Sequence, residues 1–130
     1  MKRVVHFEIQ AEDPHRAVKF YTDVFGWEIK QWGDNPYWMV VTGKEQGEWG
    51  GINGGILARR GPPPEEGAGV NGYVCTIDVL SIDETTQAIG IAGGKIVVPK
   101  NHMQGVGWIA YCKDTEGNIF GLIQNDSPQR

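Results

Sequence analysis

The sequence has neither a long apolar run nor a cluster of lysine and arginine residues. No stretch approaches the roughly 18 apolar residues of a membrane-spanning helix, and the N-terminus lacks a signal-peptide pattern. The net charge of −4 argues against nucleic acid or an anionic membrane as a partner. We therefore expect a cytoplasmic protein that binds neither nucleic acid nor membrane.

Cysteine is also scarce. Cys75 and Cys112 lie in strand-like runs and form no Cys-x-x-Cys motif, which favours free, buried thiols in a reducing compartment. Glycine, in contrast, is abundant, with 19 of the 130 residues, and many of these glycines lie inside strand-like segments. Glycine in a strand often marks a bend or a close approach of another group to the backbone.

The first strand, which begins at Val4, alternates between polar and apolar residues. His6, Glu8 and Gln10 fall on one face, and Phe7 and Ile9 fall on the other. The apolar face has an obvious partner in the helix that follows. The polar face is therefore left to solvent or to a cleft, and it carries an imidazole and a carboxylate two residues apart.

A helix is predicted from Asp13 to Gly26. Asp13 suits the N-cap, Pro14 suits the first helical position, and Gly26 suits a left-handed end. Strands are predicted at 27–32, 37–42 and 51–59, with a turn at 33–36 and a polar loop at 44–50. Residues 60–69 (RGPPPEEGAG) form the one linker-like segment, because three prolines favour extended geometry and glycines loosen both ends.

The second half repeats this pattern. A strand at 73–79 precedes a helix that starts at the capping box Ser81-Ile-Asp-Glu84 and ends at Gly93 and Gly94. Strands follow at 95–99, 108–112 and 118–124, with a loop at 101–107 and a turn at 114–117. One domain (1–126) is thus predicted, with module 1 at 1–59, a linker at 60–71, module 2 at 72–126 and a tail at 127–130.

Matching residues relate the two halves. Gly26 and Gly94 end their helices, Trp38 and Trp108 lie in matching strands, and Gly51-x-x-x-Gly55 corresponds to Gly117-x-x-x-Gly121. Such a repeat usually reflects a duplicated unit. We predict an α+β fold of two βαβββ modules, whose curved mixed sheets enclose a cleft and carry the helices outside.

Four segments carry a resemblance to a known family: V-V-H-F-E-I, D-P-x-R-A-x-x-F-Y-x-x-V-F-G-W, A-G-G-K-I-V-x-P and K-D-T-E-G-N-I-F-G-L. Over about residues 3–125 the chain resembles the vicinal oxygen chelate superfamily, which includes glyoxalase I, bleomycin-resistance proteins and extradiol dioxygenases. The motifs are specific for the fold, whereas the superfamily supports many reactions on one frame. The resemblance also implies a homodimer.

The resemblance implies four metal-ligand positions, which fall on His6, Gly55, Val74 and Gly121. Only His6 has a ligand side chain, and one imidazole does not hold a divalent ion tightly. We therefore expect no metal and no other cofactor.

The candidate site combines the polar face of the first strand with matching residues elsewhere. His6 and Glu8 are the candidate catalytic pair, a base and the carboxylate that orients it. The proposed substrate-binding residues are Gln10, Trp38, Gly55, Val74, Thr76, Asp78, Trp108 and Gly121. Polar groups among aromatic side chains are typical of small-molecule pockets.

Two functions remain open at this point. The chain is either a metal-independent lyase or isomerase that acts on a small organic molecule, or a bleomycin-resistance-type protein that sequesters a small molecule without chemistry. The His6 and Glu8 pair favours the first, because sequestration requires no proton transfer. A regulatory module that binds another protein is a third, less favoured reading.

Overall fold

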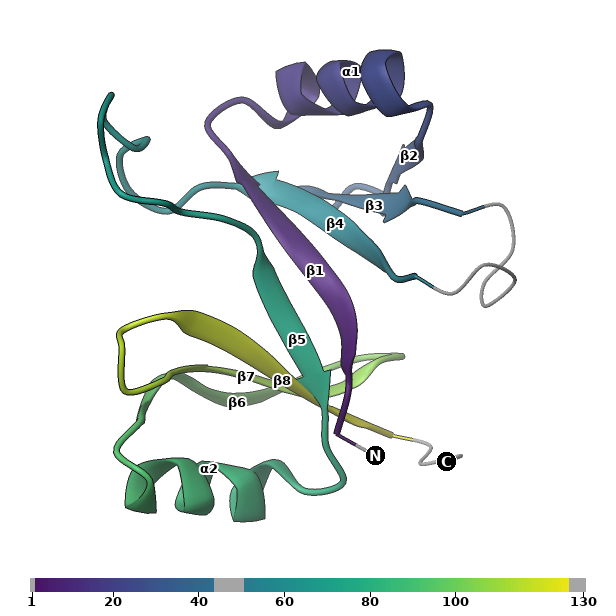
Figure 1. The fold of residues 1–130 in the computed structure, drawn as a ribbon. Coiled ribbons are helices and arrows are strands. Elements are labelled where there is room, and N and C mark those ends of the chain that lie inside the picture. Colours follow the sequence, from purple (N-terminus) through teal and green to yellow (C-terminus); the bar gives the residue numbers. More distant parts are fainter. Residues whose placement is uncertain (1, 44–50, 127–130) are drawn as a thin grey trace. The chain divides into compact units, whose positions relative to one another are not determined.

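The computed structural model describes residues 2–43 and 51–126, and Figure 1 traces the chain. The loop predicted at 44–50 and the tail at 127–130 lie outside the described residues. The chain forms two compact units: an N-terminal unit of His6–Tyr73, and a C-terminal unit that combines Met1–Val5 with Val74–Arg130. The strand β1 (Val4–Ala11) passes from one unit to the other between Val5 and His6.

The N-terminal unit contains β1, α1 (Pro14–Phe25), β2 (Glu28–Gln31), β3 (Tyr37–Val41) and β4 (Asn53–Ala58). Its strand order is β2-β3-β4-β1; β1 runs parallel to β4, and the other pairs are antiparallel. α1 covers one face of this sheet (Figure 1). The core between them consists of Phe7, Ile9, Ala11, Val40 and Ile56.

The predicted ends of α1 are confirmed. The Asp13 side chain accepts a hydrogen bond from the Arg16 N–H at 3.2 Å, and Pro14 occupies the first turn. Gly26 ends the helix with φ 72°, a conformation that glycine adopts without a steric penalty.

The C-terminal unit contains β5 (Val74–Asp78), α2 (Ile82–Ile91), β6 (Lys95–Met103), β7 (Gly107–Lys113) and β8 (Ile119–Asn125). Its strand order is β5-β8-β7-β6, with β5 parallel to β8 and the other pairs antiparallel. α2 packs on one face through a core of Val79, Ile82, Ala110, Cys112 and Leu122. Each unit therefore has the same mixed sheet and helix, and the predicted α+β fold of two βαβββ modules is confirmed.

The largest difference from the predicted boundaries is in β6. β6 extends to Met103, whereas the sequence predicted a loop from residue 101 to 107. Two register shifts, between Ile96 and Val98 and between Val98 and Asn101, allow Pro99 to lie within the strand. β6 is an edge strand, where a missing N–H is tolerated.

Neither α1 nor α2, the helices of the described residues, combines the length and apolar character needed to cross a membrane.

Candidate functional site

The polar face of β1 carries the predicted pair, and a third side chain joins them. Nε2 of His6 lies 2.7 Å from the Tyr37 hydroxyl oxygen, and this hydroxyl donates a hydrogen bond to Oε2 of Glu8 at 3.2 Å. The His6 and Tyr37 rings are nearly parallel, with an interplanar angle of 12° and centroids 6.4 Å apart. Three side chains from β1 and β3 thus form one hydrogen-bonded group, which we call the His6–Tyr37–Glu8 group.

Gly55 makes room for this group. It pairs with Glu8 on β1 and with Met39 on β3, so it lies between the two strands that carry the group. A Cβ atom on Gly55 would overlap the ring and the hydroxyl of Tyr37. Only glycine fits at position 55 while the phenol of Tyr37 lies against its backbone.

The environment of the group determines its charge. Burial lowers the pKa of His6 below its usual value of 6.5, and the negative charge of Glu8 offsets part of this shift. His6 is therefore neutral at neutral pH. Because the single Tyr37 hydroxyl proton goes to Glu8, His6 Nε2 donates to the phenol oxygen, and Nδ1 carries the lone pair that accepts a proton.

The C-terminal unit has different chemistry at the corresponding positions. Thr76 pairs with Gly121 as Glu8 pairs with Gly55, so Thr76 corresponds to Glu8 and Val74 corresponds to His6. A Cβ atom on Gly121 would lie 2.9 Å from Thr76 Oγ1 and 3.4 Å from a ring carbon of Tyr111. The imidazole and carboxylate of one module are replaced by an isopropyl group and a hydroxyl in the other.

The two tryptophans pack against the two hydrophobic cores. Trp38 packs against the core under α1, and its ring is steeply inclined to that of His15, with an interplanar angle of 75° and centroids 5.0 Å apart. Trp108 packs against the core under α2. Neighbouring side chains of a strand point to opposite faces of the sheet. Tyr37 therefore lies on the face opposite to Trp38, where it covers Gly55. The expected position of Trp38 beside the predicted pair, His6 and Glu8, is thus corrected.

The remaining predicted residues separate into two groups. Gln10 continues the His6 and Glu8 face, and its backbone oxygen accepts a hydrogen bond from Arg59 Nη2 at 3.0 Å. Asp78 is buried at the end of β5, where Oδ1 accepts a hydrogen bond from Asn125 Nδ2 at 3.3 Å. Asp78 and Trp108 meet in a separate hollow of the C-terminal unit, which is described below.

The residues at the family metal positions do not fit a metal ion. His6 directs Nε2 to a phenol, Gly55 is covered by Tyr37, and Val74 and Gly121 have no donor side chain. Within residues 2–43 and 51–126, no three histidine, cysteine, aspartate or glutamate side chains are grouped so as to hold a metal. We therefore assign no step to a metal ion.

Comparison with known proteins agrees with the fold and the motifs. The profile of the Glyoxalase/Bleomycin resistance protein/Dioxygenase superfamily matches residues 3–122. The chain belongs to this superfamily. The resemblance to the vicinal oxygen chelate superfamily is thereby confirmed.

Among the relatives of this superfamily member, a lactoylglutathione lyase of Haemophilus influenzae is 26% identical over 129 residues, which cover 96% of this chain and 94% of that protein. The glyoxylase-type protein CFP32 of Mycobacterium bovis is 30% identical over 122 residues, 90% of this chain. The chain spans only 43% of the length of CFP32.

Solved structures show the same fold. A methylmalonyl-CoA epimerase has a TM-score of 0.65 at 17% identity and covers 95% of both chains. A superfamily member from Vibrio splendidus has a TM-score of 0.63 at 17% identity, covering 96% of this chain and 99% of that one.

Proposed function

We propose that this superfamily member binds a small organic molecule and transfers a proton on it without a metal ion, as a lyase or an isomerase. The His6–Tyr37–Glu8 group is the observation that carries the proposal. A neutral imidazole is a base suited to neutral pH, and the hydrogen bond to Tyr37 fixes the orientation of its ring.

Each side chain has a distinct role in this proposal. His6 Nδ1 removes a proton from a carbon atom of the substrate, and the imidazolium that forms is stabilised by the nearby Glu8 carboxylate. Tyr37 links the two and holds the tautomer. In the N-terminal unit, Gln10 and Gly55 are the further residues that we propose for ligand binding. In the C-terminal unit, the proposed ligand-binding residues are Val74, Thr76 and Gly121.

The names of the relatives suggest substrates for the test. Lactoylglutathione and methylmalonyl-CoA each carry hydrogen on a carbon bonded to a carbonyl carbon. If His6 removes this proton in heavy water and solvent deuterium is returned, the compound gains one mass unit. We expect such exchange in the presence of a chelator, and we expect His6→Gln to slow it by about 10²-fold or more.

His15→Gln is the matched control, since His15 is an exposed histidine on α1 outside the His6–Tyr37–Glu8 group. Exchange that is equally fast in His6→Gln and in the unchanged protein would refute the role of His6. Exchange that disappears with the chelator and returns with added metal would refute the metal independence.

The sequestering alternative makes a different prediction. A protein that only binds would be stabilised against thermal unfolding by its ligand, by about 2.7 kcal/mol at a ligand concentration of 100 Kd, yet would not exchange the substrate hydrogen. Thermal shift together with mass spectrometry therefore separates the two functions.

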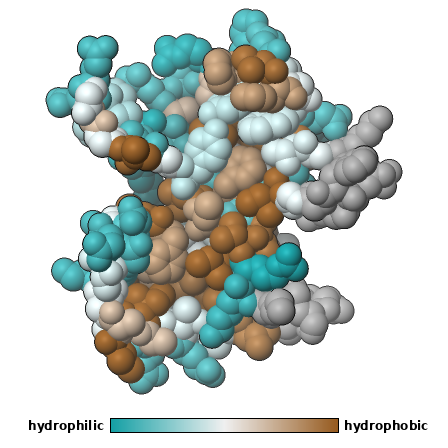
Figure 2. Space-filling model, viewed as in Figure 1, coloured by the Kyte–Doolittle hydropathy of each residue, from teal (hydrophilic) through white to brown (hydrophobic). Residues whose placement is uncertain are grey.

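We also propose that the chain is a homodimer. Apolar side chains of α1 are exposed, including Phe20 (54%), Val24 (56%) and Phe25 (58%). Figure 2 shows apolar surface in the region of this helix. Apolar residues exposed together in the second half of one helix support an association surface. Light scattering after size-exclusion chromatography should give twice the mass of 14.4 kDa at micromolar concentration, and a monomer would contradict the proposal.

A further inference from the structure

A hollow of about 260 Å³ in the C-terminal unit has no part in the proton transfer proposed above. It lies where β5 and β8 end and β7 begins. Its lining consists of Asp78, Val79, Leu80, Trp108, Gln124, Asn125 and Asp126. A water molecule occupies about 30 Å³ of liquid volume, so the hollow has room for a small organic molecule.

The described side chains that line the hollow include acidic groups but no basic ones. Among the residues that the structure describes, the lining supplies two carboxylates, two amides, one indole and two aliphatic side chains, and no lysine, arginine or histidine. Asp78 is only 8% exposed. A carboxylate in such a place interacts more strongly with a cation than one in open water, because the local dielectric constant is lower.

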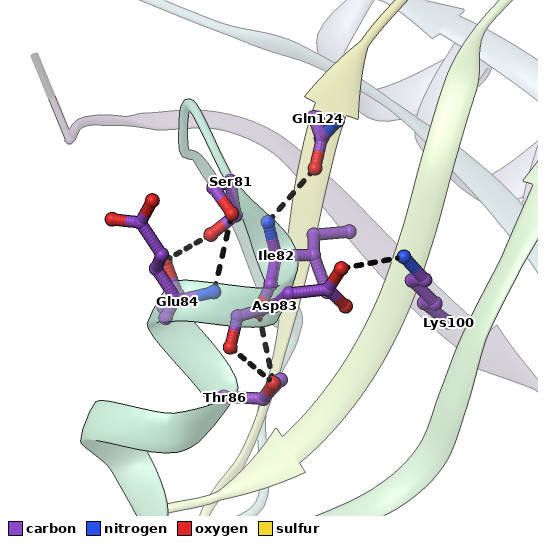
Figure 3. Close-up of polar contacts among 8 residues, drawn as sticks. Ser81, Ile82, Asp83, Glu84, Thr86, Lys100 and Gln124 are labelled. Atoms are coloured by element: carbon purple, nitrogen blue, oxygen red, sulfur yellow. Dashed lines mark hydrogen bonds and ion pairs between the residues drawn. The ribbon is translucent and has the colours of Figure 1, made fainter.

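The polar groups of the hollow are held in place by hydrogen bonds outside it. Oε1 of Gln124 accepts the backbone N–H of Ile82 at 2.9 Å, at the start of α2 (Figure 3). Both carboxylate oxygens of Asp126 lie close to Nε2 of His102, at 2.9 and 3.0 Å. The walls are therefore preorganised, which reduces the entropic cost of binding a ligand.

The indole of Trp108 already has a cation beside it. Nζ of Lys100 lies 4.9 Å from the centre of the Trp108 ring, and it also forms a 2.9 Å ion pair with Asp83, which Figure 3 shows. Ammonium groups over an indole are attracted by the electron density of the ring. The ammonium position on this ring is therefore taken by Lys100, and we expect a ligand in the hollow to meet the indole with its apolar part.

The start of α2 does not counteract a cation here. The positive end of a helix would repel one, but Asp83 and Glu84 both lie in the first turn of α2. Ser81 Oγ and Gln124 Oε1 also accept two of the first backbone N–H groups. The start of α2 therefore adds no uncompensated positive charge beside the hollow.

We propose that this hollow binds a small organic ammonium ion, with the charge on Asp78 and Asp126 and the apolar part against Trp108 and Leu80. The site is distinct from the His6–Tyr37–Glu8 group, and the proposal does not depend on the proposed reaction. It assigns a ligand-binding role to the module in which Val74 and Thr76 replace the imidazole and the carboxylate.

Benzylamine is the probe, and benzyl alcohol, which has a similar shape and no charge, is its control. We expect benzylamine to shift the NMR signals of the Trp108 indole and the Asn125 side-chain amide. The affinity for benzyl alcohol should be at least about tenfold lower, because hydrogen bonds to charged groups contribute about 1.5–3 kcal/mol.

Asp78→Asn should weaken benzylamine binding by about tenfold or more while leaving the affinity for benzyl alcohol unchanged. Glu65→Gln, an exposed change in the segment 60–69, is the control and should bind as the unchanged protein does. If Asp78→Asn does not fold, Asp126→Asn tests the second carboxylate of the hollow, which lies at the exposed rim. This variant should also weaken the binding of benzylamine. Equal affinity for amine and alcohol, or shifts confined to other residues, would overturn the proposal.

An adjoining hollow of about 550 Å³ shares Asp78, Val79 and Leu80 with this one and is lined on its other side by Lys2. The Lys2 ammonium competes with a bound cation for the charge of Asp78. Lys2→Met should therefore bind benzylamine at least as tightly as the unchanged protein, and weaker binding would contradict the assignment.

Discussion

Nε2 of His6 and the hydroxyl oxygen of Tyr37 lie 2.7 Å apart, although 31 positions separate the two residues in the sequence. His6 and Glu8 share a strand face, but residues two apart on a strand are separated by about 6–7 Å. The Tyr37 hydroxyl bridges this distance, because it also donates to Glu8. The imidazole and the carboxylate are therefore connected through the phenol.

Tyr37→Phe should couple energetically to Glu8→Gln. The phenylalanine keeps the ring but removes a donor from Glu8 and an acceptor from His6, at a cost of about 1–3 kcal/mol of unfolding free energy. We expect a double-mutant cycle in urea to give an interaction energy between about 0.5 and 3 kcal/mol. Additive effects of the two substitutions would show that the carboxylate and the phenol do not interact.

The stability of the protein should depend on pH through His6. Burial lowers its pKa in the folded state below 6.5, so the unfolded chain takes up a proton first as the pH falls. The unfolding free energy should therefore decrease as the pH falls below 6.5, until the folded pKa is passed. His6→Gln should show a smaller decrease over this range in urea titrations, and parallel profiles would contradict the assignment.

Gly55→Ala should destabilise the N-terminal unit. The new methyl group would overlap Tyr37, and overpacking typically costs about 1–3 kcal/mol. Tyr37→Ala removes the ring, so Gly55→Ala should cost less in that background. Gly69→Ala is the matched control, because nothing lies within 4 Å of its added Cβ atom. Equal costs of Gly55→Ala in both backgrounds would refute the close contact.

The loss of unfolding free energy caused by Tyr73→Phe should become smaller at high pH. Burial and a 2.8 Å hydrogen bond with the Tyr21 hydroxyl raise the pKa of Tyr73 from 10.0 to about 12. The unfolded chain therefore loses this proton first, and stability should fall as the pH rises from 10 to 12. At pH 8 the variant should be less stable by about 0.5–1.5 kcal/mol. Unfolding curves in which this gap stays constant up to pH 12 would contradict the shift.

Local chemistry allowed much of the fold to be predicted from the sequence. Asp13 and Gly26 set the ends of α1 through contacts with their own neighbours, and Ser81 accepts the Glu84 N–H at the start of α2 as the capping motif predicted. The end of β6 was missed because its residues pair with β7 around two register shifts. Such shifts depend on the partner strand and leave no local pattern.

The site was predicted only in part, for a related reason. Alternation placed His6 and Glu8 on one face, but it does not decide which of two adjacent aromatic residues faces a core. Trp38 packs under α1, and Tyr37, whose hydroxyl requires a partner, lies on the polar face. A signal was present in the sequence: the central glycine of a predicted strand, Gly55, leaves space that only a neighbouring side chain fills.

The overlap between a side chain at position 55 and the phenol of Tyr37 also restricts how the family site could evolve in this chain. A glutamate at position 55 would supply a metal ligand, but it would enter space that Tyr37 occupies. The substitution at position 37 would therefore have to arise first, and the intermediate would lack both the phenol bridge and the new ligand. If the His6–Tyr37–Glu8 group has the role proposed above, the chain would lose this function before it gained a ligand at position 55.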